Sequence, residues 1–467
     1  MSLFQWLDIH AEQRPNHPAI VDCVGGQTVS YAQFRRRSGA QAVRLQTLGV
    51  GAGDRVAVLS PNRIEILEML FACARLGAIL VPLNWRLSVD EQAKIFADCK
   101  PSQLFYDPSL PLPETDAPCR LLDGAGETDL PPAPSVEGAL LILYTGGTTG
   151  VPKGAVLTHE SIAANARNTV EGWRLEADEV IPVFTPMFHT GGLNVACTPL
   201  FYLGGTVVLP PPFTAESALE VIEAQRCTLV FLVPTMFSML KESPRFDPDR
   251  LRTVRAFISG GAPCPQPLME AYWEAGLPLR QGYGLTEAGP NNFRATLDDA
   301  RQRPGTVGKA LPGVELKLAG NGELLIRGEH VMAGYWQRAT SDIEEGWLHT
   351  GDLARVDSDG FYYICGRSKE MYISGGENVF PAEVEEVLLA HPDVLEAAVV
   401  GVPDAKWGEV GRAYLVPRPG ATLSTDAIAA FCQGRLARYK TPKQVYVMAG
   451  LPKSPAGKVL KRMLMPA

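Results

Sequence analysis

The stretch YTGGTTGVPKG, residues 144–154, follows the apolar run 139–143, which predicts a buried strand. Its glycines leave backbone N–H groups unhindered, its threonines add hydroxyl donors, and Lys153 adds a positive charge. Such a loop suits a polyanion, and we interpret it as a site for the phosphate chain of a nucleotide. It is not a Walker A motif, because Gly154 and not Ser or Thr follows the lysine. Taken alone, the stretch also fits a plain glycine-rich surface turn.

Length and composition predict a globular protein of two or more domains. The chain has 467 residues, more than one ordinary core accommodates. Its net charge of −8 argues against nucleic acid as a partner and against a polybasic membrane-binding patch. The nine cysteines form no C-x-x-C pair, so we expect neither a zinc site nor a disulfide framework.

The same features favour the cytoplasm. The first residues lack the basic segment of a signal peptide, and reduced thiols fit that compartment. The apolar stretch 64–83 carries charges and the stretch 229–240 is too short, so we expect no integral membrane segment.

Strand-like and helix-like stretches alternate through the first 300 or so residues. Strands are predicted at 55–59 and 79–81, with a helix at 64–76 between them. Ser88 and Glu91 form a capping box for the next helix. Further strands are predicted at 207–209, 229–233, 254–258 and 279–281, and an exposed connection at 108–134. The alternation predicts an α/β fold with parallel sheets covered on both faces.

The pattern changes along the last third of the chain. Between about 305 and 365 it predicts short antiparallel strands with tight turns. Beyond that lies an α+β unit, with a helix opening at Pro381, strands at 396–402 and 412–416, and a helix at 424–437. We therefore expect a large N-terminal domain, 1–367, made of doubly covered sheets plus a small β-rich subdomain, and a small C-terminal α+β domain, 368–467.

A second segment of interest is QGYGLTE, residues 281–287, at the end of a predicted strand. The carboxyl ends of strands in α/β sheets are where ligands bind. Tyr283 could stack on a purine, and Glu287 could hold Mg²⁺, which favours one or two carboxylates together with phosphates. Alone, the segment also fits a loop whose tyrosine fills the core.

Two later segments complete the pattern. WLHTGD, residues 347–352, is followed by GRSK, residues 366–369, and Asp352 could accept hydrogen bonds from ribose hydroxyls. PKSPAGK, residues 452–458, places Lys458 on a Pro/Gly loop close to the end of the chain. Taken alone, the first segment also fits an aspartate in an ordinary turn, and the second fits a solvated basic tail.

Together the four segments resemble, in order and spacing, the signature of the adenylate-forming superfamily. That superfamily includes acyl-CoA synthetases, peptide-synthetase adenylation domains and luciferase. The resemblance covers nearly the whole chain and is greatest to fatty-acyl-CoA and related carboxylate–CoA ligases. One departure is Gly147, where the family usually has serine, which removes one hydroxyl contact to phosphate.

The resemblance implies a set of site residues. For ATP or AMP it implies Thr145, Gly146, Gly147, Thr148, Thr149, Gly150, Lys153, Gly261, Ala262, Gly282, Tyr283, Gly284, Thr286, Asp352, Arg367, Asn378 and Lys458. For coenzyme A it implies Ser374, Gly375, Gly376 and Trp407, and for the acyl group His189, Gly191 and Gly192. The implied catalytic residues are Lys458, Glu287, Thr149 and His189.

The implied reaction has two halves. A carboxylate attacks the α-phosphate of ATP to give acyl-AMP and pyrophosphate, and the thiol of CoA then displaces AMP. Lys458 would offset the repulsion between the carboxylate and the nucleotide, and Mg²⁺, held by Glu287 and Thr149, would neutralise the leaving pyrophosphate. Family members then rotate the small, mobile domain about the hinge position, here Lys369. We expect His189 to gate or orient, since a carboxylate needs no general base at neutral pH.

The sequence thus predicts an AMP-forming carboxylate–CoA ligase that uses ATP, Mg²⁺ and CoA. Our first expectation for the acid is a medium- or long-chain fatty acid, and the second is an aryl acid. The chief alternative is an adenylating enzyme that loads a carrier-protein phosphopantetheine. A luciferase-like oxygenase and a non-catalytic nucleotide-binding protein are lesser alternatives, and a homodimer is left open.

Overall fold

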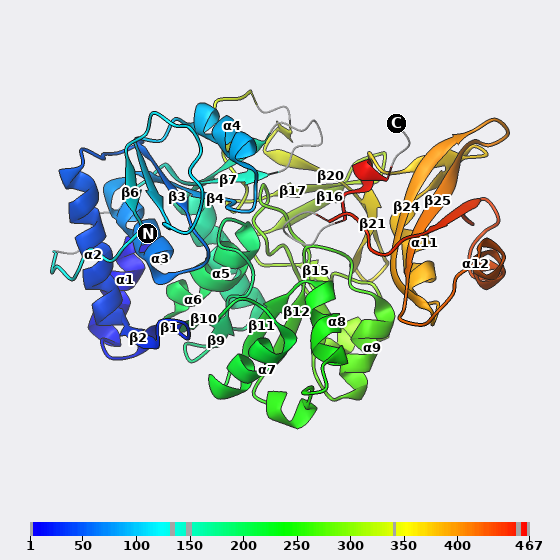
Figure 1. Ribbon diagram of the computed structural model, residues 1–467, viewed down its shortest axis with the longest axis horizontal. Helices are drawn as coiled ribbons and strands as arrows, with labels where there is room; N and C mark the ends of the chain where they lie inside the picture. The colour runs from blue at the N-terminus through cyan, green and yellow to red at the C-terminus, as the bar shows by residue number, and fades with distance from the viewer. Residues whose placement is uncertain (1–2, 131–135, 146–151, 340–341, 454–458, 465–467) are drawn as a thin grey trace.

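The computed structural model describes residues 3–130, 136–145, 152–339, 342–453 and 459–464. Figure 1 shows a larger body built from the N-terminal and middle parts of the chain, and a smaller body, in orange and red, built from its last part. This arrangement matches the predicted α/β fold with a large first domain and a small second one.

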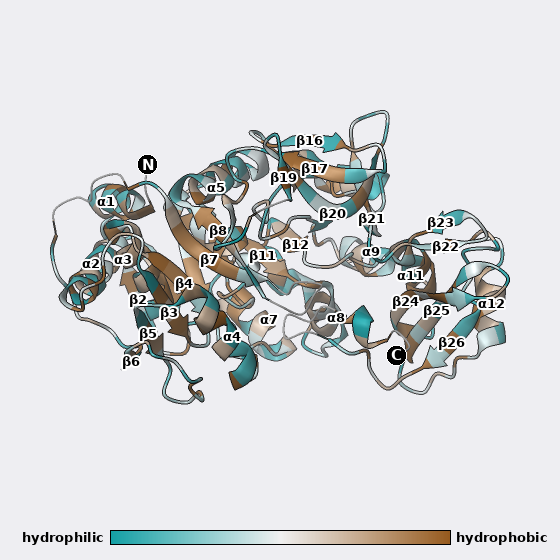
Figure 2. Cartoon of the chain, turned by 90° about the horizontal axis from the view of Figure 1, so that it is seen from above, coloured by the Kyte–Doolittle hydropathy of each residue, from teal (hydrophilic) through white to brown (hydrophobic). Residues whose placement is uncertain are grey.

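A seven-stranded sheet lies at the centre of the larger body, with strand order β18-β8-β7-β4-β3-β5-β6. Its strands are β3 (Arg55–Leu59), β4 (Ile79–Leu83), β5 (Gln103–Tyr106), β6 (Cys119–Leu121), β7 (Ala139–Thr145), β8 (Lys153–Thr158) and β18 (Gly334–Tyr335). The surrounding helices are α1 (Leu3–Gln13), α2 (Tyr31–Thr47), α3 (Ile64–Leu76), α4 (Val89–Cys99) and α5 (His159–Trp173). Figure 2 shows the hydrophobic colour concentrated on β4, β7 and the neighbouring β11 (Leu229–Leu232) inside this body.

Both faces of this sheet are covered, as the continuous apolar strands predict. In β3, Val56 and Val58 belong to the buried cluster that includes residues of α1, α2 and α3. Their neighbours Ala57 and Leu59 point the other way and pack with residues of α4. The side chain of Ser88 caps α4 in a capping box with Glu91, as predicted.

Two further sheets extend the larger body. One has the order β2-β1-β10-β9, and the other is the parallel sheet β11-β12-β13. Their strands are β1 (Pro18–Asp22), β2 (Gln27–Ser30), β9 (Val180–Pro182), β10 (Thr206–Leu209), β12 (Ala256–Ser259) and β13 (Leu279–Gln281). The helices beside them are α6 (Thr198–Leu203), α7 (Ala215–Ala224), α8 (Pro234–Glu242) and α9 (Gln266–Glu274).

The β-rich subdomain is antiparallel, as predicted. It pairs β16 (Glu315–Leu318), β17 (Glu323–Arg327), β19 (Ile343–Glu344), β20 (Trp347–Val356) and β21 (Tyr362–Arg367). Short elements between it and the sheets above are β14 (Phe293–Arg294), α10 (Leu297–Gln302) and β15 (Lys309–Ala310).

The smaller body is an α+β unit with its own cores. Its sheet runs β23-β22-β25-β24, with β26 beside β25. The elements are β22 (Tyr372–Ser374), β23 (Glu377–Val379), α11 (Pro381–Leu389), β24 (Val394–Asp404), β25 (Gly408–Pro417), α12 (Thr425–Cys432), β26 (Gln444–Val447) and the 3₁₀ helix η3 (Lys461–Met463). The preceding sheet ends at Arg367 and this one starts at Tyr372, so the predicted boundary near 367–369 falls between two sheets. The exact division of domains stays a prediction.

Three local predictions were wrong. The predicted helix at 424–437 ends at Cys432, because Gln433 is extended and Gly434 has a positive φ of 78°. The central sheet is mixed rather than parallel, since β7 pairs antiparallel with β8. The connection at 108–134 contains a short strand, β6, that pairs with β5. Within the described ranges, no helix combines the length and the apolar character needed to cross a membrane.

Burial of His159 predicts a loss of stability in acid. Burial lowers the pKa of His159 to about 4 from 6.5, and neither ring nitrogen has a hydrogen-bond partner among the described residues. Between those pH values the unfolded chain binds more protons than the folded one, so folding weakens as the pH falls. We expect the His159→Leu variant to keep more of its pH 7 stability at pH 5 than the parent does, measured as the urea midpoint. An identical pH dependence of the two midpoints would contradict this.

Candidate active site

The glycine- and threonine-rich loop closes a hairpin. Thr145, the last residue of β7, pairs with Lys153, the first residue of β8. Gly154 has to lack a side chain, because a Cβ there would lie 2.7 Å from Ile142. Gly146, Gly147, Thr148, Thr149 and Gly150 lie outside the described residues, and their predicted contacts stay predictions.

Glu287 meets the end of this hairpin from a distant part of the chain. Its Oε1 accepts hydrogen bonds from the hydroxyl of Thr145 at 3.2 Å and from the hydroxyl of Tyr335 at 3.0 Å. Tyr335 lies on β18, which pairs with β8, and Lys153 Nζ sits 4.7 Å from the centre of its ring. The sequence analysis missed Tyr335, because nothing local in the sequence indicates that residues 334–335 add a strand to β8.

The surroundings of Glu287 fit a magnesium ion. Two hydroxyl donors hold its carboxylate, and among the described residues no lysine, arginine or histidine forms an ion pair with it. Mg²⁺ commonly takes one protein carboxylate and completes its shell with water and phosphate. In the described part of the chain, no three His, Cys, Asp or Glu side chains gather into a group that could hold a metal ion.

A second polar group joins Tyr283, Asp352 and Arg367. The hydroxyl of Tyr283 donates to Asp352 Oδ2 at 2.6 Å, and Arg367 Nε donates to Asp352 Oδ1 at 3.0 Å. Burial, and next the charge of Asp352, raise the pKa of the Tyr283 hydroxyl. Asp352 is buried within strand β20 and is not a turn residue, although Gly351 before it has a φ of 70°. Both carboxylate oxygens are therefore fixed in direction before any ligand arrives.

The loops after β12 and β13 lie side by side. Gly282 donates its N–H to the carbonyl of Ser259 at 2.7 Å, so the loop with Gly261 and Ala262 adjoins the loop with Tyr283. Gly284 has no room for a Cβ, which would meet the backbone of Pro290 at 2.0 Å. Gly261, Ala262 and Thr286 have accessible surface at this edge of the sheet. Among the residues predicted to bind the nucleotide, those in the loop after β12 therefore lie next to those in the loop after β13.

The predicted acyl segment leads into a π-helix, Gly191–Cys197. Such helices are rare and occur often at functional sites. Gly192 packs so closely that a Cβ would lie 2.3 Å from the carbonyl oxygen of Pro186. A Cβ on Gly191 would lie 3.2 Å from the ring of Phe231, and one on Gly260 would lie 2.8 Å from the same ring. Phe231, which the sequence analysis did not single out, therefore fits between a glycine of the π-helix and a glycine of the loop after β12.

His189 precedes this helix and is partly buried against Phe188, with ring centres 4.5 Å apart. Burial, and to a lesser extent the charge of Arg86, lower its pKa to about 4. It is therefore neutral at pH 7, and its buried Nε2 has no hydrogen-bond partner in the described residues. A neutral ring with one unused nitrogen suits the predicted orienting role, which stays a prediction.

The residues predicted to contact CoA gather in the smaller body. Gly375 and Gly376 form the turn between β22 and β23, with φ values of 62° and 88°. Gly375 donates its N–H to the carbonyl of Trp407 at 2.8 Å, and Ser374 precedes it. Asn378 belongs to this same hairpin, opposite Ile373, and not to the Tyr283–Asp352 group.

Lys369 lies between β21 and β22, where a hinge is predicted. Lys458 lies outside the described residues, so its distance from the other groups stays untested.

Comparison with known families gives two matches. The family model described as AMP-binding enzyme matches residues 7–336, and the model of the AMP-binding enzyme C-terminal domain matches residues 383–458.

Several characterised relatives match along nearly the whole chain. The indoleacetate–CoA ligase of Aromatoleum aromaticum is 39% identical, covering 99% of this chain and 97% of its own. A feruloyl-CoA synthase of Amycolatopsis is 40% identical, covering 98% and 97%. The long-chain-fatty-acid–CoA ligase FadD13 of Mycobacterium tuberculosis is 34% identical, covering 96% and 95%. The predicted class, a carboxylate–CoA ligase, is the class that these names state.

Solved structures agree. The o-succinylbenzoate CoA synthetase of Bacillus subtilis, in complex with its acyl-adenylate intermediate, superimposes with a TM-score of 0.90 at 32% identity, covering 99% of this chain and 98% of that one. The same synthetase with ATP and a magnesium ion gives a TM-score of 0.89 at 31% identity, covering 98% and 99%. With both domains matched and the predicted resemblance confirmed, this chain belongs to the AMP-binding enzyme family, that is, to the adenylate-forming superfamily.

Proposed function

We propose that this enzyme activates an aromatic carboxylic acid with ATP and Mg²⁺ and transfers the acyl group from acyl-AMP to coenzyme A. The single structural observation that favours an aromatic acid is the ring of Phe231, held between Gly191 and Gly260 beside the predicted acyl segment. Phe231 is 8% exposed, and we infer that this remaining surface of the ring meets the acid, because aromatic rings pair favourably with one another. The two relatives at 39–40% identity, named for indoleacetate and ferulate, support the same choice.

A medium- or long-chain fatty acid, our first expectation from the sequence, is not confirmed. The relative named for long-chain fatty acids is more distant, at 34% identity. The CoA thiol as acceptor, rather than a carrier protein, is supported by the names of all three relatives. A homodimer and a cytoplasmic location remain proposals.

For the first half-reaction, we propose that the described residues would hold ATP at two points. Asp352, already oriented by Tyr283 and Arg367, would accept hydrogen bonds from the ribose hydroxyls. At the other point, Thr145 and Tyr335 fix the Glu287 carboxylate that would hold Mg²⁺ with Thr149. When bound, the ion supplies positive charge to the leaving pyrophosphate.

Lys458 would bring the carboxylate and the α-phosphate together by neutralising both. His189 stays uncharged, so it would orient the acid through a hydrogen bond without competing with Lys458. For the second half-reaction, rotation about Lys369 would exchange Lys458 for the hairpin of Ser374, Gly375 and Gly376, beside Trp407.

An acid panel tests the substrate. We expect indoleacetate, ferulate and benzoate-type acids to give faster CoA-dependent pyrophosphate release than octanoate or palmitate. The Phe231→Leu variant should raise KM for the preferred aromatic acid by about 10-fold, since an aromatic pair and lost burial together contribute about 1.5 kcal/mol. Its KM for ATP should stay unchanged.

Phe246→Leu is the matched control, because Phe246 packs against Tyr272 in a separate cluster behind the parallel sheet. Faster turnover of fatty acids than of every aromatic acid would contradict the proposed substrate class. An equal effect of both substitutions on the acid KM would remove Phe231 from the acyl site.

Separating the half-reactions tests Lys458. In the Lys458→Ala variant, acid-dependent ATP–pyrophosphate exchange should fall by about 10²–10³-fold, the usual cost of losing one charge contact to a reacting group. Thioester formation from supplied acyl-AMP should persist, because that step needs no cation at the α-phosphate. Lys443→Ala, at an exposed lysine of the same domain, should leave both rates unchanged. Parallel loss of both half-reactions in Lys458→Ala would contradict the assignment.

A further inference from the structure

Lys461 lies three residues beyond Lys458, on η3, and binds two carboxylates. Its Nζ lies 2.8 Å from Glu385 Oε1 on α11 and 3.0 Å from Glu370 Oε2, one residue after the predicted hinge. Only 18% of its side chain is exposed. Burial opposes the charged form, but Glu385 and Glu370 outweigh it and raise the pKa of the Lys461 ammonium. Lys461 is therefore a charged lysine held inside a carboxylate pair.

The partner Glu385 is itself fixed in place. Its Oε1 also accepts a hydrogen bond from the backbone N–H of Val399 on β24, at 2.7 Å. Lys461 thus ties η3 to a helix and, through that helix, to the sheet of the smaller body. Glu370 adds the turn after β21, where its N–H donates to the carbonyl of Arg367 at 3.0 Å.

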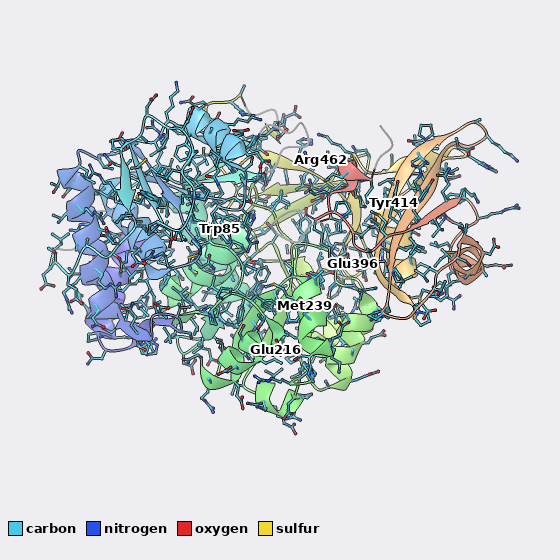
Figure 3. All side chains as sticks on the ribbon, in the orientation of Figure 1. Trp85, Glu216, Met239, Glu396, Tyr414 and Arg462 are labelled. Carbon is cyan, nitrogen blue, oxygen red and sulfur yellow. The ribbon has the colours of Figure 1, made fainter. Side chains whose placement is uncertain are left out.

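The chain on either side of residues 454–458 is anchored as well. Lys453 and Val459 form an antiparallel bridge, and Leu460 donates its N–H to the carbonyl of Pro452 at 2.8 Å. Lys453 Nζ pairs with Glu396 on β24 at 2.8 Å. Figure 3 labels Glu396, together with Arg462 of η3 and Tyr414, and Figure 1 shows η3 in red between the two bodies. Tyr414 donates its hydroxyl to the carbonyl of Leu464 at 2.6 Å.

These contacts have a shared consequence. The residues on both sides of positions 454–458 are anchored on the smaller body, and Lys461, with 18% of its side chain exposed, is the less exposed of the two lysines in these anchors, the other being Lys453 at 29%. We propose that Lys461, clamped between Glu370 and Glu385, is a positioning residue: it holds the anchored flank next to positions 454–458, and so it selectively controls adenylate formation, the step assigned to Lys458.

The inference rests on the proposed function. A positioning role and a merely structural role of Lys461 differ in which half-reaction is lost when Lys461 is replaced. If the clamp positions Lys458, its loss harms only the step that needs Lys458. A residue that simply stabilises the smaller body would affect both steps, since the predicted CoA hairpin belongs to the same body.

The test compares Lys461→Met with Lys440→Met. Lys440 is a matched control, because it pairs with Glu383 on the same helix α11 at 2.5 Å and its side chain is 20% exposed. Acid-dependent ATP–pyrophosphate exchange should fall about 10²-fold in Lys461→Met, the loss associated with a misplacement of about 1 Å. Thioester formation from supplied acyl-AMP should stay within about twofold of the parent rate, and Lys440→Met should change neither rate by more than that. Lys461→Arg should restore most of the exchange, since it keeps the charge.

The Glu385→Gln variant is a second test of the inference. It removes one charge of the clamp but keeps a side-chain oxygen that can accept the hydrogen bond from the Val399 N–H. It should produce the same selective loss, smaller than in Lys461→Met, and it decides the matter if Lys461→Met does not fold. Equal losses in both half-reactions, or unchanged exchange, would overturn the inference. If the parent enzyme shows no ATP–pyrophosphate exchange with any acid, the proposed function is overturned and the inference with it. If the parent is active but the variant loses both half-reactions equally, the inference alone is overturned.

Discussion

The contact between Thr145 and Glu287 is the constraint on which the rest of the site depends. One residue ends a strand of the central sheet, and the other follows the last strand of a separate parallel sheet, 142 positions later. Tyr335 adds a third region of the chain to the same carboxylate oxygen. A carboxylate that is held by two hydroxyl groups, with no ion pair among the described residues, suits the role we propose for it, which is to hold a metal ion beside phosphates. The geometry therefore makes sense as preparation for a ligand.

The two bodies divide the chemistry. In the proposed function the larger one would fix the nucleotide and the acyl group on sheets that share one extended core, in which Phe231, Leu143 and Leu193 all take part. The smaller one has separate cores, built around residues such as Tyr372, Val399 and Val410. A unit with its own cores and its own sheet can turn as a rigid body, which the two half-reactions require. Charged pairs such as Lys461–Glu385 lie within that unit and would move with it.

Much of this could be predicted from sequence, where the signal is local. Buried apolar runs gave the strands β3, β4 and β7 nearly residue for residue, and the Ser88–Glu91 capping box marked the start of α4. The order of the glycine-rich and acidic segments identified the superfamily. The helix predicted at 424–437 is longer than α12, because the apolar pattern continues past Gly434, whose positive φ ends the helix.

What could not be predicted depends on pairing between distant segments. No local pattern shows that β18 adds to β8, so Tyr335 was missed. Phe231 looks like an ordinary core residue in an apolar strand, and only the closeness of Gly191 and Gly260 sets it apart. Lys461 looks like part of a solvated basic tail until Glu370 and Glu385 are seen beside it. The central prediction for Lys458 concerns a residue outside the described ranges.

A crystal structure of this protein with ATP and Mg²⁺ tests the account most directly. It should show the triphosphate against the end of the β7–β8 hairpin, with the ion coordinated by the Glu287 carboxylate and the ribose hydroxyls on Asp352. A triphosphate bound elsewhere, with the Thr145–Glu287 hydrogen bond undisturbed and no ion at Glu287, would contradict it.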